Sequence, residues 1–164
     1  MNTEYLDRDQ LAAWVRLVAI LELLPGVLDT QLRRDAQLTH FDYYVLAMLS
    51  EAPGRVLRMT ALAQQTGATL ARLSHVVQRL ETRGLVERFP CPEDKRATNA
   101  RLTDAGRQKV QDSAPGHVAT VRHYVIDALT PEQITHLTSI GDAILNRLDP
   151  DGNRVAFYRR YDTP

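Results

Sequence analysis

The stretch TLARLSHVVQRLETRGLVERFPCPEDKRATNARL, residues 69–102, decides the fold of this chain. Its first half has the apolar spacing of a helix that is capped by Thr69 and closed by Gly84. Apolar and polar residues alternate in residues 85–89 and again in residues 98–102, which is typical of half-buried strands. A charged, proline-containing turn separates these strands, so the second half predicts a β-hairpin.

A shorter helix precedes this stretch. It is predicted over residues 60–66, and Gly67 ends it. Two helices joined by a short glycine-containing turn and followed by a basic hairpin predict a winged helix-turn-helix. Because an α-helix fits the major groove of DNA and a charged hairpin can reach a neighbouring minor groove, this arrangement favours DNA binding. The predicted fold class is mainly α with a small β-hairpin wing.

The helix that follows Thr69 is the predicted recognition helix, and it has two faces. Four apolar residues share one side and are expected to pack on the domain core: Leu70, Leu73, Val77 and Leu80. The opposite side carries side chains that we expect to contact DNA: Ala71, Arg72, Ser74, His75, Gln78 and Arg79. Of these, the best placed for base edges are Arg72, Ser74, His75 and Gln78. A solvated polar face that binds nothing would show the same pattern. The helix alone therefore does not distinguish the two interpretations, and the sequence of the hairpin is needed.

The tip of the predicted hairpin holds Asp94, Lys95 and Arg96, two cations beside one acid. We expect the Asp94 carboxylate to hold the Arg96 guanidinium in one orientation, ready to enter an A·T-rich minor groove. Arg88, on the first strand, joins the expected DNA contacts. A charged turn is a weak signal by itself, but this one follows directly after a basic helix.

The charge distribution supports the same conclusion. The formal net charge is zero, yet the basic residues are concentrated in the middle third. Residues 1–54 hold four Lys/Arg and eight acids (−4), residues 55–109 hold eleven and five (+6), and residues 110–164 hold five and seven (−2). A basic module between acidic flanks is what phosphate binding requires.

Apolar helices flank the predicted DNA-binding module. The first is expected over residues 9–34, with a kink or break at Pro25-Gly26, and a second over residues 40–50. After the hairpin we expect a helix that breaks or bends at residues 113–116 and a last helix that begins at Thr130-Pro-Glu-Gln133. The first and last helices carry more apolar surface than a small winged domain can cover, which predicts a dimer.

The resulting division of the chain has four parts. They are an N-terminal dimerisation helix (1–36), the winged helix-turn-helix domain (37–105), C-terminal dimerisation helices (106–150) and a mobile tail (151–164). No uninterrupted apolar run approaches the length of a membrane span, and the acidic N-terminus is wrong for a signal peptide. We therefore expect a cytoplasmic protein without membrane contact.

Several kinds of site are not expected. Cys91 is the single cysteine, so an intramolecular disulfide or a cysteine-based zinc cluster is excluded. An incidental loop thiol is the simplest interpretation of Cys91, and redox activity stays open. His117, His123 and His136 are scattered, so we predict no metal and no cofactor. Catalytic residues are not predicted either, because neither a convincing nucleophile–base pair nor a Gly-rich phosphate loop occurs.

The residues that carry these features also resemble a known family. The stretches LETRGLVER (80–88), PEDKRA (92–97) and LTDAG (102–106), with Leu62-Ala63 and Gly67 before them, are similar to the signature of MarR-type (multiple-antibiotic-resistance) regulators. The resemblance implies a homodimer that binds a palindromic operator in double-stranded DNA and represses transcription. It also implies that Thr69 occupies a recognition-helix position.

The resemblance further implies release from DNA by a small aromatic or phenolic acid. An aromatic wall with a nearby cation suits such a ligand, and we expect it to be formed by Trp14, Arg16, His40, Tyr43 and Tyr44. A plain core role for Trp14 and Tyr44 is the alternative. For the whole chain, the main alternative is a winged-helix module that binds proteins and never contacts DNA, and an enzyme is the third hypothesis.

Overall fold

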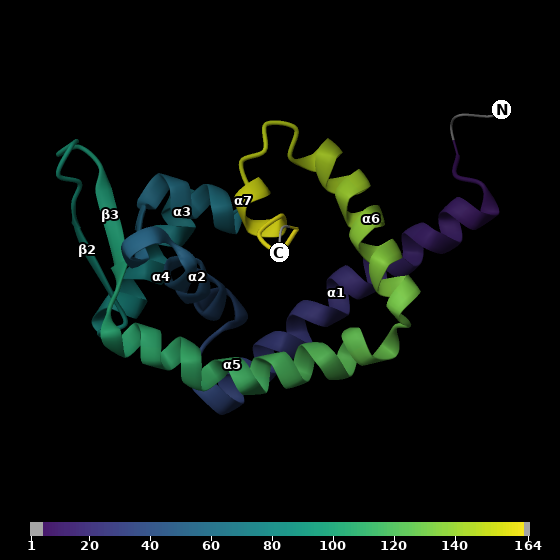
Figure 1. Ribbon diagram of the computed structural model, residues 1–164, viewed down its shortest axis with the longest axis horizontal. Coiled ribbons are helices and arrows are strands. Elements are labelled where there is room, and N and C mark those ends of the chain that lie inside the picture. The colour runs from purple at the N-terminus through teal and green to yellow at the C-terminus, as the bar shows by residue number, and fades with distance from the viewer. Residues whose placement is uncertain (1–4, 163–164) are drawn as a thin grey trace.

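The computed structural model describes residues 5–162 and is mainly helical, with one small sheet (Figure 1). In chain order the elements are α1 (Arg8–Ala36), α2 (His40–Glu51), the 3₁₀ helix η1 (Pro53–Arg55), β1 (Val56–Arg58), α3 (Met59–Thr66), α4 (Leu70–Thr82), β2 (Val86–Pro90), β3 (Thr98–Leu102), α5 (Asp104–Tyr124), the 3₁₀ helix η2 (Ile126–Ala128), α6 (Pro131–Leu148) and α7 (Val155–Tyr158). The predicted fold class is confirmed.

The sheet has three antiparallel strands in the order β1-β3-β2. The predicted hairpin is present, with Val86 opposite Leu102 and Pro90 opposite Thr98. Strand β1 pairs with the other edge of β3 and was not predicted, because a strand of three residues is too short to show alternation. The sheet closes one side of a core that α2, α3 and α4 share.

Local sequence signals set the helix-turn-helix. Gly67 ends α3 in the left-handed conformation (φ 64°), which glycine adopts without steric cost. The Thr69 hydroxyl then accepts a hydrogen bond from the Arg72 backbone N–H and caps α4. These two residues fix where α3 stops and where α4 begins, as the sequence predicted.

The chain was expected to kink, bend or break near two prolines, and the break is wrong at both. α1 runs without interruption through Pro25, since one lost backbone hydrogen bond is small beside the burial of Leu28, Leu32 and Ala36 in its second half. α5 likewise continues through Pro115. A Cβ atom on Gly116 would lie 2.9 Å from Gln31 Nε2, so this glycine allows the close approach of α5 to α1.

Helix α6 lies apart from the α2–α4 core, beside the first half of α1 (Figure 1). It has the predicted capping box between Thr130 and Gln133, but none of its residues is buried. Large apolar side chains are exposed on both helices, including Leu11, Trp14, Ile20, Leu21, Leu23, Ile134, Leu137, Ile140 and Ile144. A groove of about 710 Å³ separates them.

The expectation that no segment of the chain is apolar and long enough to span a membrane is corrected at α1. Its most apolar 18 residues have a mean hydropathy of 1.9 despite Arg16 and Glu22, so α1 is long and apolar enough to cross a bilayer by these two criteria. Arg16 and Glu22 interrupt the apolar run, so no uninterrupted run of this length marks the window in the sequence. Length and composition are weak indications of a membrane span, because a helix that packs on another protein meets the same criteria.

The prediction of a mobile C-terminal tail is wrong for the described part of that segment. Its short helix α7 lies beside α3 (Figure 1), and Phe157 packs against the core of the DNA-binding region. The Phe157 ring meets the Tyr44 ring edge-on, with centroids 5.1 Å apart. The anchoring aromatic pair is 113 residues apart in sequence, so no local pattern could indicate it.

Candidate nucleic-acid interface

Helix α4 buries a different set of residues from the one predicted. Leu73, Val77 and Leu80 are buried as expected, and Val76 joins them. Leu70 is the exception, because 49% of its surface is exposed. It occupies the first turn of α4, ahead of the buried residues, and its side chain lies at the outer surface instead of in the core.

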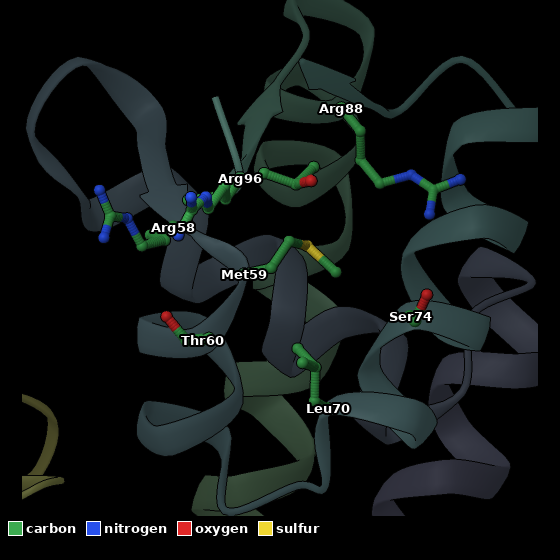
Figure 2. Close-up of a pocket in the computed structure, with 9 residues that line it drawn as sticks. Arg58, Met59, Thr60, Leu70, Ser74, Arg88 and Arg96 are labelled. Atoms are coloured by element: carbon green, nitrogen blue, oxygen red, sulfur yellow. The ribbon is translucent and has the colours of Figure 1, made fainter. Parts of the chain in front are cut away.

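A hollow of about 240 Å³ lies between α4 and the wing, and Leu70 lines it. Figure 2 shows Leu70 and Ser74 on the α4 side of this hollow, with Arg58 and Arg96 across from them. The hollow therefore combines an apolar side chain and a hydroxyl on the predicted recognition helix with two arginines on the sheet and wing. We call it the wing hollow; its lining is Arg58, Met59, Thr60, Leu70, Ser74, Arg88, Arg96, Ala97 and Thr98.

A second hollow of about 420 Å³ lies on the other side of α4, toward α1 and α2. Three predicted DNA contacts line it: Arg72, His75 and Arg79. The Arg72 guanidinium stacks on the Phe41 ring at 4.2 Å from its centroid, which orients the charge while leaving the side chain exposed. Ala71, His75 and Gln78 are exposed as well.

Arg79 pairs with a buried acid inside the domain. Its guanidinium donates to the carboxylate of Asp42, which is 2% exposed. The same carboxylate accepts a hydrogen bond from the Thr39 backbone N–H at 2.9 Å, closing the capping box of α2. This pair fastens α4 to the start of α2, yet 51% of the Arg79 side chain is exposed, so its expected DNA contact stays a prediction.

Arg88 is also paired internally. Its Nη2 donates to Glu81 Oε2 at 2.8 Å, and its backbone N–H donates to Glu81 Oε1 at 2.9 Å. The hydrogen bond from the Arg88 side chain is the main reason that the pKa of Glu81 lies below its usual range. Figure 2 shows the Arg88 side chain pointing away from Arg96. Arg88 therefore joins the base of the wing to α4, and its expected DNA contact stays a prediction.

At the wing tip, the expected contact between Asp94 and the Arg96 guanidinium is absent. Asp94 Oδ1 instead accepts from the Arg96 backbone N–H at 3.1 Å, because a short acid two residues before an N–H closes a local turn. Among residues 5–162, Lys95 and Arg96 form no ion pair within 4.0 Å, and both are exposed. Asp94 shapes the turn, while the cations remain available to a ligand.

Arg58 is a residue of this surface that the sequence argument missed. It ends β1, and its Nη2 lies 3.4 Å from the sulfur of Cys91. Cys91 is buried, and its thiol donates to Glu93 Oε2 at 3.0 Å, a bond that holds the pKa of Glu93 below its usual range. The only available signal for Arg58 was its place in the basic middle third, because β1 itself was not predicted.

The five expected effector residues do not form one pocket within the chain. Trp14 is half exposed, and Arg16 donates to the carbonyl of Ala12. His40 donates its backbone N–H to Asp29, which lies about 22 Å along α1 from Trp14. Tyr44 faces α3 and α7, where its hydroxyl donates to the Gln65 carbonyl at 3.1 Å, in line with the alternative of a structural role.

Two of the five residues, His40 and Tyr43, do meet at the junction of α1, α2 and α5. The His117 ring stacks near the His40 ring at 6.2 Å and contacts the Tyr43 ring at 4.6 Å. Burial lowers the pKa of both histidines, and the nearby charge of His40 lowers that of His117 further. Two buried atoms, Gln31 Oε1 and His117 Nδ1, have no hydrogen-bond partner among the described residues. Residues 5–162 contain no group of three or more acids, histidines or cysteines fit to hold a metal ion.

Comparison with known proteins places this geometry in context. A model of the MarR family matches residues 36–97. Sco3205, a MarR family transcriptional regulator from Streptomyces coelicolor solved in complex with DNA, is 44% identical, with a TM-score of 0.86 over 89% of this chain and 95% of that one. AbsC, a MarR family transcriptional regulator from the same organism, is 37% identical, with a TM-score of 0.84 over 89% and 98%. The HTH-type transcriptional repressor YetL of Bacillus subtilis (strain 168) is 24% identical over 131 residues, 74% of this chain and 78% of YetL.

Proposed function

The chain belongs to the MarR family, and from this premise we propose that it is a homodimeric repressor that binds a palindromic operator through helix α4 and the wing. Membership makes it a DNA-binding transcription regulator rather than an enzyme. The dimer, the operator symmetry, the repression and the roles of individual residues are the proposed parts. In a two-fold dimer the two α4 helices would enter successive major grooves about 34 Å apart.

The observation that carries this proposal is the pairing state of the arginines around α4. Arg79 and Arg88 are held by internal acids, whereas Lys95 and Arg96 are exposed and free of described acids beside the exposed face of α4. Free cations beside a helix that fits the major groove suit phosphates and a minor groove. A surface for a protein partner has no need of this concentration of unpaired cations.

The contacts are proposed in three groups. Thr69, Ala71, Arg72, Ser74, His75 and Gln78 face base edges or adjacent phosphates, and Leu70 is added to them because it is exposed. Lys95 and Arg96 reach the backbone or the minor groove. Asp94, Arg79 and Arg88 act through other residues, by shaping the turn and fixing α4 and the wing.

Selection of preferred duplexes from a random DNA pool, followed by a salt titration of the selected duplex, tests the proposal. Neutralising several phosphates makes affinity fall steeply with salt, so we expect a linear plot of log affinity against log salt with a slope of about −0.9 per phosphate contact. A protein-interaction module would select no sequence and show no such slope, and that result would refute DNA recognition.

The homodimer is proposed from the exposed apolar surfaces of α1 and α6. An 18-residue helix without a single buried residue gains little packing energy within the chain, so α6 needs a partner surface. The groove between α1 and α6 is lined almost wholly by apolar side chains. A second copy would cover both helices at once and would also explain the hydropathy of α1.

A small aromatic acid is proposed as the effector, bound at the junction of α1, α2 and α5. Its hydroxyl or protonated carboxyl group would donate to Gln31 Oε1, and a second polar atom would satisfy His117 Nδ1. Two proteins of this fold give a precedent: CouR of Rhodococcus jostii RHA1 bound to p-coumaroyl-CoA (23% identical) and BpsR of Bordetella bronchiseptica, whose DNA binding is regulated by 6-hydroxynicotinic acid (19% identical). Hydroxybenzoic acids added to the DNA titration should weaken binding of the wild type but not of Gln31→Leu.

A further inference from the structure

The C-terminal segment returns to the helix-turn-helix and packs against it. Residues 149–160, which we call the C-terminal strap, follow α6 and carry α7 back to the helix-turn-helix (Figure 1). The strap meets α2 and α3 at the side chain of Arg154 and the ring of Phe157. It thereby connects the end of α6 to the region that positions α4.

Arg154 occupies the centre of this contact. Its Nε donates to the backbone carbonyl of Gln65 at 3.0 Å, and its Nη2 donates to the Tyr44 hydroxyl at 2.9 Å. The Tyr44 hydroxyl itself donates to the same Gln65 carbonyl at 3.1 Å, so the three groups form a closed triangle. Gln65 belongs to the last turn of α3, where carbonyls lack partners within the helix and a positive charge is favourable.

The guanidinium also lies over the turn between α3 and α4. A Cβ atom built on Gly67 would be 3.0 Å from Arg154 Nη1, so this glycine leaves the space that the arginine occupies. Two residues later, Thr69 caps the recognition helix. The direction in which α4 leaves α3 depends on this turn, and Arg154 holds the turn from outside.

The strap is itself fixed to the end of α6. The carboxylate of Asp149, the C-cap residue of α6, accepts from the backbone N–H groups of Asn153 and Arg154 at 2.9 Å each. It also accepts from the Tyr158 hydroxyl at 3.2 Å. Further along, Arg160 lies 3.9 Å from Glu51 at the end of α2. Arg154 is therefore held in place before it reaches the turn.

We infer that Arg154 is a positioning residue for sequence-specific DNA recognition, because it fixes the α3–α4 turn from which the recognition helix starts. The inference rests on the proposed function. Since Arg154 acts on the orientation of α4 and not on phosphate, its loss reduces discrimination between sequences and leaves general affinity for DNA in place. The same contacts make the strap a connection between the α6 arm and the reading surface.

The test compares Arg154→Ala with the wild type on the selected duplex and on a random duplex of equal length. We expect about a tenfold loss of affinity for the selected duplex, in line with the loss of charge-assisted hydrogen bonds. Random-duplex affinity should stay within about twofold and the salt slope should not change, because no phosphate contact is lost. Arg159→Ala is the matched control: it removes the same charge from the same segment, where the Arg159 guanidinium hydrogen-bonds only to Asn146 among the described residues.

Other results overturn the inference. Unchanged selectivity in Arg154→Ala refutes it, equal losses on both duplexes indicate a purely structural role, and a salt slope reduced by about one indicates a direct phosphate contact. If Arg154→Ala does not fold, Tyr44→Phe gives the same readout, because it keeps the ring against Phe157 and removes the bridging hydroxyl. Tyr44→Phe should also lose selectivity, and retained selectivity would contradict the inference. Absence of any selected duplex for the wild type is a different outcome and counts against the proposed function alone.

Discussion

The arginines around α4 divide into two kinds, and the division matters for mechanism. Arg79 and Arg88 face acids of the same domain and fix the angles between α2, α4 and the wing. Arg96 forms no ion pair with an acid among residues 5–162. A charge that is already paired offers little to a phosphate, whereas a free charge releases counterions from DNA when it binds. Removal of a paired arginine should therefore change the stability of the fold, and removal of a free arginine should change the affinity for DNA.

The variants Arg79→Ala and Arg96→Ala separate these two effects. Arg79→Ala leaves the buried Asp42 carboxylate without its cation, which should lower the free energy of unfolding by about 1–3 kcal/mol. Arg96→Ala should change that free energy by less than about 0.5 kcal/mol. It should weaken selected and random duplexes alike and reduce the salt slope by about one. Urea unfolding measures the free energy of unfolding, and a salt-dependent DNA titration measures affinity and salt slope. If Arg79→Ala keeps its stability but has a reduced salt slope, Arg79 contacts phosphate and its assignment to a structural role is wrong.

Leu70 gives a second prediction at this scale. An exposed apolar side chain on the first turn of a recognition helix suits the C5-methyl group of thymine. Replacement of thymine by deoxyuridine removes that methyl group and keeps every hydrogen-bonding atom. We expect deoxyuridine at one position of each half-site to weaken wild-type binding by about threefold to tenfold, the effect of a buried methyl group.

Leu70→Ala is the control for this scan. Without the leucine side chain, the same thymine-to-deoxyuridine exchange should no longer change affinity. If the exchange affects both proteins equally at every position, or affects neither, Leu70 does not read a methyl group. Leu73→Ala is not a suitable comparison, because it would open a cavity in the core.

What the sequence predicted at the residue scale depended on local spacing. Thr69, Gly67 and the polar face of α4 were predictable because capping and helical periodicity are local. The roles of Arg79 and Arg154 were not, since their partners are 37 and 89 residues away in the chain. Leu70 has the spacing of a core residue, but whether the first turn of a helix is covered depends on the neighbouring elements.

At the scale of elements, the junction of α1, α2 and α5 holds two half-buried histidines, and neither ring is paired with a carboxylate in the described part of the chain. His40 and His117 stack near each other, and burial is the main cause that lowers the pKa of each below its ordinary value of about 6.5. The charge of Asp29 opposes this lowering of the His40 pKa but is the smaller of the two causes. Protonation of both rings would place two like charges side by side in a poorly solvated junction.

This junction predicts that stability falls in mild acid. A lowered pKa in the folded state means that the unfolded chain binds protons first as the pH decreases, so the contribution of the neutral histidines is complete above about pH 6.5 and is lost below it. Thermal unfolding at pH 7.5 and pH 5.5 should show a smaller decrease in melting temperature for His117→Gln than for the wild type. His123→Gln, which changes an exposed histidine on the same helix, should behave as the wild type does. An equal decrease in all three proteins would refute the assignment.

Element boundaries were predictable where the sequence carries caps and failed where packing overrides them. A threonine N-cap indicated the starts of α4 and α6, and threonine also caps α2 and α5 in the structure. The breaks expected at Pro25 and Pro115 did not occur, and in α1 the burial of Leu28 and Leu32 after the proline offsets one lost hydrogen bond. β1 and α7 are held by tertiary contacts alone, and neither has a pattern long enough to detect.

At the scale of the whole molecule, the chain forms an open arrangement in which α6 and the first half of α1 lie away from the buried core (Figure 1). A helix in this position is stable only if another surface covers it. A second copy and a lipid bilayer are the two candidates that the apolar surface allows. The two candidates differ in geometry, because a dimer buries the facing sides of α1 and α6, whereas a bilayer surrounds α1 on all sides.

A single charge on α6 distinguishes these two possibilities. Leu137 lines the groove between α1 and α6 and is 49% exposed, so Leu137→Glu should place an unpaired charge in a dimer interface. Thr135→Glu adds the same charge on the opposite side of the same helix.

In sedimentation equilibrium at micromolar concentration we expect dimers for the wild type and Thr135→Glu, and monomers with weakened DNA binding for Leu137→Glu. A wild-type monomer that co-sediments with lipid vesicles would instead assign α1 to a membrane, and an undisturbed Leu137→Glu dimer would move the interface to another surface. Because two linked α4 helices bind a two-fold operator far more tightly than one, the loss of DNA affinity in Leu137→Glu should exceed that in Arg96→Ala.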